Sequence, residues 1–129
     1  MHQKIAVLST MSVEIKKIYL YTSGRYNRKS YLLYGVLPFL VLGAVLGFLN
    51  ATYGILDGLS EYLILPFIVW PLLAVQIKRW HDIGLSGWFS VLTFLPYVGH
   101  IIACIIGLIP GNNNKNRFGS PSNQLDQSL

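Results

Sequence analysis

Charge is scarce in this chain of 129 residues. Asp, Glu, Lys and Arg together make up 12% of the sequence and hydrophobic residues 53%, whereas typical soluble domains are roughly 25% charged. A water-exposed surface needs more charge than this composition supplies. The deficit therefore excludes an ordinary soluble domain and indicates that lipid surrounds much of the protein.

Cysteine and acidic residues are also few. The single cysteine, Cys104, excludes an internal disulfide and a cysteine-based metal cluster. Lys and Arg outnumber Asp and Glu by ten to five, and six of these ten basic residues precede residue 30. Basic residues next to a membrane segment are typical of a cytoplasmic anchor facing anionic lipid. We therefore expect no nucleic-acid partner, no cofactor and no bound metal.

Three long apolar runs predict an all-α integral membrane protein. They cover about residues 31–49, 60–77 and 88–109, and each is close to the roughly 20 residues that a helix needs to cross a bilayer. The third is broken near Pro96–Gly99, because proline cannot donate a backbone hydrogen bond and glycine permits a turn. It predicts either a third straight span, which we favour, or a re-entrant hairpin of two short arms.

The basic residues also predict the orientation. The segment before the first run carries six of them, the loop 50–61 none and the loop 78–87 two. The positive-inside rule places the N-terminus and the second loop in the cytoplasm, and the loop around Asp57 outside. Three spans would leave the C-terminal tail outside, whereas a hairpin would return Lys115 and Arg117 to the cytoplasm.

Composition divides the chain into three parts. Residues 1–23 are predicted to form a basic interfacial segment with a short amphipathic helix, residues 24–119 a helical membrane domain, and residues 120–129 a disordered tail with little to bury. Within the first run, Gly43 and Gly47 have the G-x-x-x-G spacing that lets another helix approach closely. A second copy of the chain or another membrane protein is therefore a candidate partner.

The stretch KRWHDIGLSGW, residues 78–88, concentrates polar side chains between the second and third runs. Its tryptophans, basic residues and glycines predict a short cytoplasmic turn in the headgroup layer. A second interpretation is a lipid-headgroup site made by Arg79, His81 and Asp82. In such a site the arginine would bind a phosphate, and the histidine beside the carboxylate would hold a proton near neutral pH.

Three motifs, in this order along the chain, resemble those of a known family. SGRYNRKSY resembles its G-R-x-x-R-x-x-Y approach to the first span, RWHDIGLSGW its R-x-H-D-x-G-x-S-G-W signature, and LPYVG followed by IPGNNNKNRFG its proline–glycine break and its P-G … N-R-[YF]-G exit. The family consists of small bacterial inner-membrane proteins catalogued as domain of unknown function 805. The resemblance covers about residues 20–120 and implies a bacterial inner-membrane location and a compact helical bundle, with no known reaction. The chain departs from the family at His100, where a bulky apolar residue is usual.

The polar residues of these motifs fall into three patches: Arg25 and Arg28; Arg79, His81 and Asp82; and Asn116 and Arg117. The first two patches share the cytoplasmic face, and the third joins them only if the third run is a hairpin. Asp82 is the natural counter-ion for Arg25 or Arg28, because a buried charge needs a partner. We therefore predict a structural ion-pair cluster rather than a catalytic site.

These observations predict a small multi-span inner-membrane protein without enzymatic activity, whose cytoplasmic-face cluster contacts anionic lipid headgroups or membrane partners. One alternative is a small oligomeric channel or transporter, although no run carries a row of polar residues to line a pore. Another is a membrane enzyme that acts on a phosphorylated lipid through His81, although no nucleophile–base pair or metal-ligand spacing supports it. His100, a polar residue inside the third run, is a further functional candidate.

Overall fold

The computed structural model describes residues 2–56 and 58–121, and within these ranges every regular element is a helix. The all-α fold class predicted from the sequence is therefore confirmed. Asp57 and most of the tail predicted over 120–129 lie outside the described residues, so the disorder of that tail stays a prediction. The elements are, in chain order, α1 (His2–Tyr19), α2 (Arg28–Tyr31), η1 (Leu32–Val36), α3 (Leu37–Tyr53), α4 (Gly58–Ile83), η2 (Gly87–Phe94) and α5 (Val98–Leu108).

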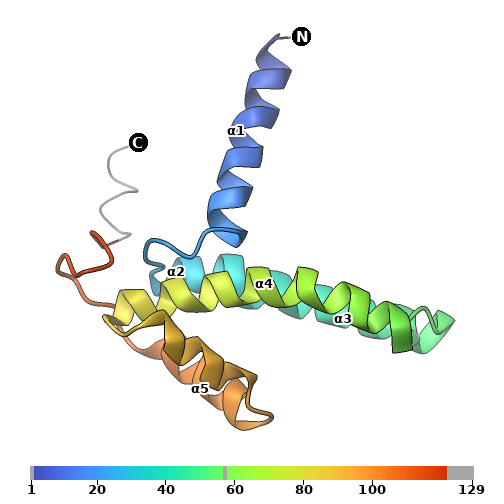
Figure 1. Cartoon of the computed structure of the whole chain (residues 1–129). Coiled ribbons are helices and arrows are strands. Elements are labelled where there is room, and N and C mark those ends of the chain that lie inside the picture. The colour runs from blue at the N-terminus through green and yellow to red at the C-terminus, as the bar shows by residue number, and fades with distance from the viewer. Residues whose placement is uncertain (1, 57, 122–129) are drawn as a thin grey trace.

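Two helices in the described part of the chain are long and apolar enough to cross a membrane. The first is the continuous helix Arg28–Tyr53, 26 residues made of α2, the π-helical turn η1 and α3. The second is the segment Tyr62–Ile83 of α4, 22 residues long. They run alongside each other in opposite directions (Figure 1). Little of the first helix is buried, as expected where the surrounding solvent is as apolar as the side chains.

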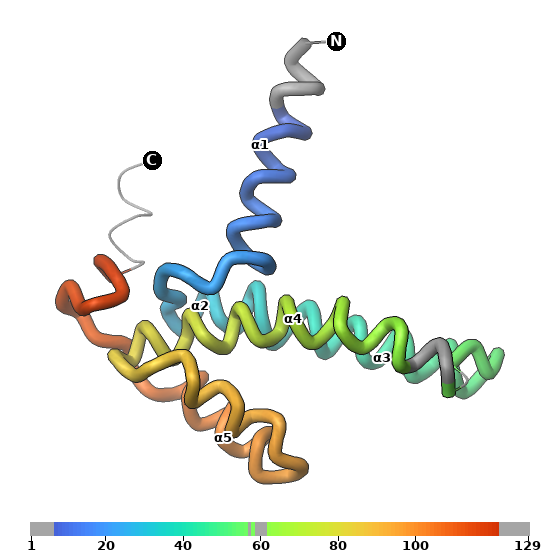
Figure 2. The backbone as a smooth tube through the Cα atoms, in the orientation of Figure 1, coloured from blue at the N-terminus to red at the C-terminus, as the bar shows by residue number. Residues whose placement is uncertain are grey.

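The third apolar run forms a hairpin instead of a straight helix. Its arms are the 3₁₀ helix η2, of 8 residues, and α5, of 11 residues, which pack against each other in opposite directions (Figure 2). Neither arm has the length of a full span. The prediction of a straight third span is therefore wrong, and the third run is a hairpin. In the described part of the chain, two helices, not three, have spanning length.

The hairpin has a local cause, and it lies at the predicted break. Pro96 has no N–H to continue the helix, and Tyr97 takes a positive φ of 63°, which is strained for a bulky residue. The two arms then approach so closely that a Cβ added at Gly99 would overlap the backbone of Thr93. Only glycine therefore fits at position 99, where the two arms of the hairpin approach each other.

α4 is longer than the second apolar run predicts. The run suggests a helix over about 60–77, whereas α4 continues to Ile83 and ends before Gly84, whose φ is 90°. Much of the stretch predicted to be a turn is therefore helical, and the connection to η2 occupies only residues 84–86. This correction matters for the site, because residues three apart on a helix share a face.

The buried core lies where the start of the first span, α4 and the hairpin meet, and it is formed by Tyr31, Val75, Trp80 and Ile106. Glycine permits this close packing: a Cβ at Gly35 would lie 2.7 Å from Cγ1 of Val75. At Gly43 and Gly47, in contrast, an added Cβ would meet nothing within 4 Å. The predicted G-x-x-x-G contact is therefore not made within the described chain, and contact with a partner stays a prediction.

α1 stands apart and runs crosswise to α3 and α4 (Figure 1). Its C-terminal end is anchored to α4. Nζ of Lys78 donates to the carbonyls of Lys17 and, at 2.8 Å, Ile18, and Nε1 of Trp70 donates to the carbonyl of Leu20 at 3.3 Å. The N-terminal segment thus contains a helix, and its location at a membrane surface stays a prediction.

Replacing Gly99 by alanine is expected to lower the Tm of the purified protein in detergent, because the new Cβ collides with the Thr93 backbone. Overpacking of this kind typically costs about 1–3 kcal/mol. Gly43→Ala is the matched control: its Cβ meets nothing, and alanine favours a helix over glycine by about 1 kcal/mol. A loss of Tm at Gly99 no greater than at Gly43 would mean that the arms do not close there.

Candidate functional site

The candidate site begins with two residues on one face of α4. Arg79 and Asp82 are three residues apart, and Nη1 of Arg79 donates to Oδ2 of Asp82 at 2.7 Å. The other carboxylate oxygen, Oδ1, accepts from Nε of Arg25 at 3.1 Å and lies 3.1 Å from its Nη2. All three side chains are at least 96% buried. We call Arg25, Arg79 and Asp82 the ion-pair cluster.

Arg79 also binds the C-terminal end of α5. Its Nε donates to the carbonyl of Ile106 at 2.8 Å, and its Nη2 donates to the carbonyl of Ile109. The last carbonyls of a helix have no partner within the helix and carry its negative dipole end. A third bond runs from Nη1 to the carbonyl of Tyr26 at 3.1 Å. Arg79 therefore ties α4 to α5 and to the segment before the first span.

Arg25 binds the loop that follows the hairpin. Its Nη1 donates to the carbonyls of Asn114 at 2.9 Å and Gly119 at 3.2 Å, and its Nη2 donates to the carbonyl of Asn112. The loop is further fixed to α4 because the Asn112 N–H donates to the carbonyl of Asp82 at 2.8 Å. The segment before α2 and the loop after α5 are thus joined at one place.

The charge in the ion-pair cluster does not cancel between side chains alone, because two guanidinium groups face one carboxylate. Backbone carbonyls supply the remaining negative partial charge, and every guanidinium nitrogen of Arg25 and Arg79 has an acceptor. A buried ionic group is tolerated when it is paired and fully hydrogen-bonded in this way. The ion-pair cluster is consequently closed, with no guanidinium nitrogen left to bind a phosphate.

His81 is turned away from the carboxylate that follows it. Its Nδ1 lies 3.2 Å from the carbonyl of Gly24, which can only accept, so this nitrogen carries the proton. Its ring stacks on Phe118 with a centroid distance of 3.8 Å. The Asp82 carboxylate faces the two arginines instead. The predicted pairing of His81 with Asp82 for proton transfer is therefore not what the geometry provides.

The remaining predicted residues surround the ion-pair cluster. Asn116 donates from Nδ2 to the carbonyl of His81 at 2.9 Å. Arg28 and Arg117 are exposed at the rim, where Arg117 lies over the Phe118 ring at 4.7 Å and Arg28 makes a long contact of 3.5 Å with the carbonyl of Leu108. The three sequence patches therefore meet, and the predicted contact of Asp82 is confirmed for Arg25.

Two contributors were missed by sequence reasoning. Gly111 approaches Asp82 so closely that a Cβ there would overlap the carboxylate; the proline–glycine pair of the exit motif was the available signal. Lys78 is buried beside Arg79, with Nζ 4.7 Å from the centroid of the Tyr26 ring. Burial, with the nearby Tyr19 and Tyr34 phenols, raises the pKa of Tyr26, so this cation lies over a neutral ring.

A small polar cavity opens beside the ion-pair cluster. Its volume is about 90 Å³, and its walls include Asn27, Arg28, Asp82 and Gly111. This volume has room for a few water molecules and not for a lipid headgroup with its glycerol. Among the described residues, no three His, Cys, Asp or Glu side chains gather in a way that could hold a metal ion.

The residues that build this site are those of the family motifs. A family model described as protein of unknown function (DUF805) matches residues 19–120. The chain belongs to this family. The match confirms the resemblance drawn from the three motifs, and it starts at the end of α1 and ends just after the loop held by Arg25, so the DUF805 segment contains every residue of the ion-pair cluster.

Two curated relatives match most of the chain. The inner membrane protein YhaI of Escherichia coli K12 is 32% identical over 110 residues, which are 84% of this chain and 91% of YhaI. The inner membrane protein YhaH of the same strain is 32% identical over 113 residues, 83% of this chain and 91% of YhaH. No solved structure matches the chain.

Asp82→Asn is expected to lower the Tm in detergent far more than Glu14→Gln. The first change leaves two buried arginines without a counter-charge, and breaking a buried pair costs about 3–5 kcal/mol. The second removes an exposed pair with Lys17 whose side chains are 58% and 63% exposed, which is worth about 0.2–1 kcal/mol. Differential scanning fluorimetry compares them, and similar losses would show that Asp82 is merely a solvated residue.

Proposed function

We propose that the chain is a bacterial inner-membrane protein with two spans and a re-entrant hairpin, which holds the ion-pair cluster at the cytoplasmic surface and binds anionic lipid headgroups around it. The observation that carries this proposal is the meeting, at the ion-pair cluster, of the segment before the first span, the end of α4 and the loop after the hairpin. That end of the bundle collects the basic residues, so the positive-inside rule assigns it to the cytoplasm. The two E. coli inner-membrane relatives support the location.

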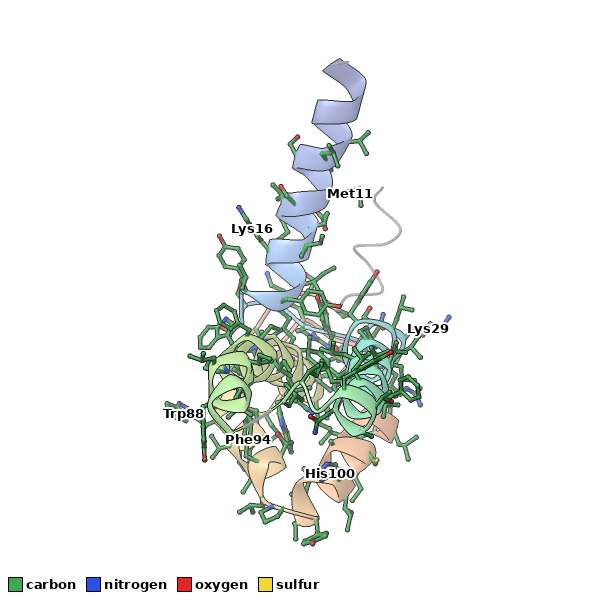
Figure 3. The ribbon with its side chains drawn as sticks, turned by 90° about the vertical axis from the view of Figure 1, so that its right-hand side faces the viewer. Met11, Lys16, Lys29, Trp88, Phe94 and His100 are labelled. Atoms are coloured by element: carbon green, nitrogen blue, oxygen red, sulfur yellow. The ribbon has the colours of Figure 1, made fainter. Side chains whose placement is uncertain are left out.

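The cations at this end fall into two groups. Arg25, Lys78 and Arg79 are buried and bind backbone carbonyls, with Arg25 and Arg79 also pairing with Asp82. The exposed basic side chains are Lys16, Lys17, Arg28, Lys29, Lys115 and Arg117; Lys16 and Lys29 point away from the bundle (Figure 3). Each basic residue near an anionic membrane surface contributes about 1 kcal/mol to membrane binding. The side chains of the second group are exposed, so we assign the lipid contact to them.

α1 is suited to lie in the headgroup layer. Val7, Leu8, Met11 and Ile15 recur at helical spacing on one face and are exposed, and Lys16 follows them. An apolar stripe bordered by lysine is typical of a helix that lies in the membrane interface. Because α1 runs crosswise to the two spans (Figure 1), α1 is parallel to the plane of a bilayer that the spans cross.

A groove under the C-terminal end of α1 is the best-formed place for a headgroup. Its volume is about 840 Å³, and its walls include Lys16, Lys17, Tyr21 and Ser23, together with Glu14, whose carboxylate pairs with Lys17 at 3.2 Å. This volume falls in the range of about 300–1,000 Å³ that is usual for small-molecule sites. Ammonium groups beside hydroxyl donors suit the oxygens of a phosphate.

The geometry supports a structural rather than a chemical role for the signature residues. The Asp82 carboxylate is held by two arginines, and His81 is engaged with Gly24 and Phe118. Neither group is oriented toward the other, as an acid–base pair requires. We therefore assign no reaction to His81, and we assign the ion-pair cluster the task of holding the hairpin ends at the membrane surface.

The proposed topology predicts that residues 29 and 115 lie on the same, cytoplasmic, side. Single cysteines at Lys29 and Lys115, in a Cys104→Ser background, should be protected from an impermeant maleimide in cells with a permeable outer membrane. A cysteine at Tyr53, at the opposite end of the first span, should be labelled. Labelling at position 115 equal to that at position 53 would place the tail outside and overturn the re-entrant hairpin.

The proposed headgroup contact predicts selective retention of phosphatidylglycerol over phosphatidylcholine by the full-length protein in native mass spectrometry. Exchanging Lys16, Lys17 and Lys29 for Gln should reduce this retention, by about fivefold for each cation that contributes 1 kcal/mol, and added salt should do the same. Exchanging the same three for Arg keeps the charge and is the matched control. Equal retention of the two lipids by the unaltered protein would contradict the proposal.

A further inference from the structure

A second cavity lies inside the bundle, away from the ion-pair cluster. Its volume is about 250 Å³, it is partly open to the outside, and its walls come from the first span, α4 and both arms of the hairpin. Most of its lining is apolar, including Phe39, Leu72 and Phe94, and its polar lining includes Gln76, Thr93 and His100. Phe94 and His100 lie on the two arms of the hairpin, below the spans in the view of Figure 3.

Gln76 brings a buried acceptor to this cavity. The residue is 6% exposed, and no donor among the described residues reaches its Oε1. Its amide interacts with the hydroxyl of Tyr31, which itself donates to the carbonyl of Ala103 at 3.4 Å. This chain of bonds occupies the donor end of the amide and leaves the acceptor end open. A buried acceptor without a donor is rare in a folded protein and calls for a partner.

The other polar groups in the wall do not fill this need. The hydroxyl hydrogen of Thr93 is used in a bond of 2.6 Å to the carbonyl of Ser90. His100 lines the cavity and is exposed. The wall from the first span includes Gly35 and Val36 of the π-helical turn η1, and such turns recur at functional sites.

We propose that this cavity binds a hydrophobic alcohol. The hydroxyl donates to Oε1 of Gln76, the alcohol oxygen accepts from the His100 ring, and the aliphatic part lies among the apolar side chains. A carboxylate or phosphate is disfavoured because no Lys or Arg among the described residues lines the cavity, and burying an unpaired anion is costly. The volume is close to the lower end of the usual range of about 300–1,000 Å³, so it takes a short chain or the hydroxyl-bearing end of a longer one.

Photolabelling tests this assignment on the full-length protein in detergent. The probe is a diazirine derivative of 1-octanol, and cross-linked peptides are identified by mass spectrometry. We expect saturable labelling of lining residues on α4 and the hairpin, reduced by excess 1-octanol and not by its methyl ether, which lacks the donor. Competition by dioctanoylglycerol would identify a glycerolipid hydroxyl as the natural source, and competition by 1-octanol alone a free alcohol.

Two variants test the hydrogen-bond acceptor of Gln76 and the volume of the cavity separately. Gln76→Leu removes the acceptor and should reduce labelling by about fivefold, the value of one hydrogen bond of 1 kcal/mol. Ala103→Leu fills the cavity from α5, leaves Gln76 in place, and should reduce labelling at least as much. Ala51→Leu, on the exposed face of α3, is the matched control and should change nothing. Labelling spread over the lipid-facing side of α3, equal competition by the methyl ether, or labelling unchanged in both cavity variants would overturn the proposal.

Discussion

The bundle depends on the carboxylate of Asp82, held between Arg25 and Arg79. Each of its oxygens accepts from a different arginine, and those arginines extend the hydrogen bonds to the end of α5 and to the loop beyond it. Without the carboxylate, two buried like charges would face each other in surroundings of low dielectric. A charged side chain is costly within a helix of spanning length. Its pairing with two arginines explains why Asp82 is found near the end of α4.

Lys78 and Arg79 show how two adjacent residues of α4 serve different helix ends. Lys78 reaches the last carbonyls of α1, at Lys17 and Ile18, and its compact ammonium is sufficient for that single task. Arg79 must bind carbonyls from α5 and from the segment before the first span, as well as a carboxylate. The planar guanidinium has five donors and can bind all of these acceptors at once. Lipid tails have no donors to offer the same carbonyls.

Sequence reasoning found those parts of the site that depend on side-chain charge. The need of a buried charge for a partner predicted the pairing of Asp82 with Arg25 or Arg28, and the three motif patches predicted a joint site if the third run folds back. The extension of α4 to Ile83 was missed because charged residues at the end of an apolar run look like a loop. The carbonyl acceptors at Asn112 and Asn114 were not predictable, since backbone groups leave no mark in the sequence.

The ion-pair cluster and the cavity at Gln76 belong to one packing arrangement. Gln76 lies three residues before Arg79 on α4, and Ala103 lies three residues before Ile106 on α5, so each pair shares a helix face. The bond from Arg79 to the Ile106 carbonyl fixes the position of α5 along α4. That position brings the Ala103 carbonyl to the Tyr31 hydroxyl and so decides which end of the Gln76 amide is left without a partner. A change in the ion-pair cluster is therefore expected to alter the cavity as well.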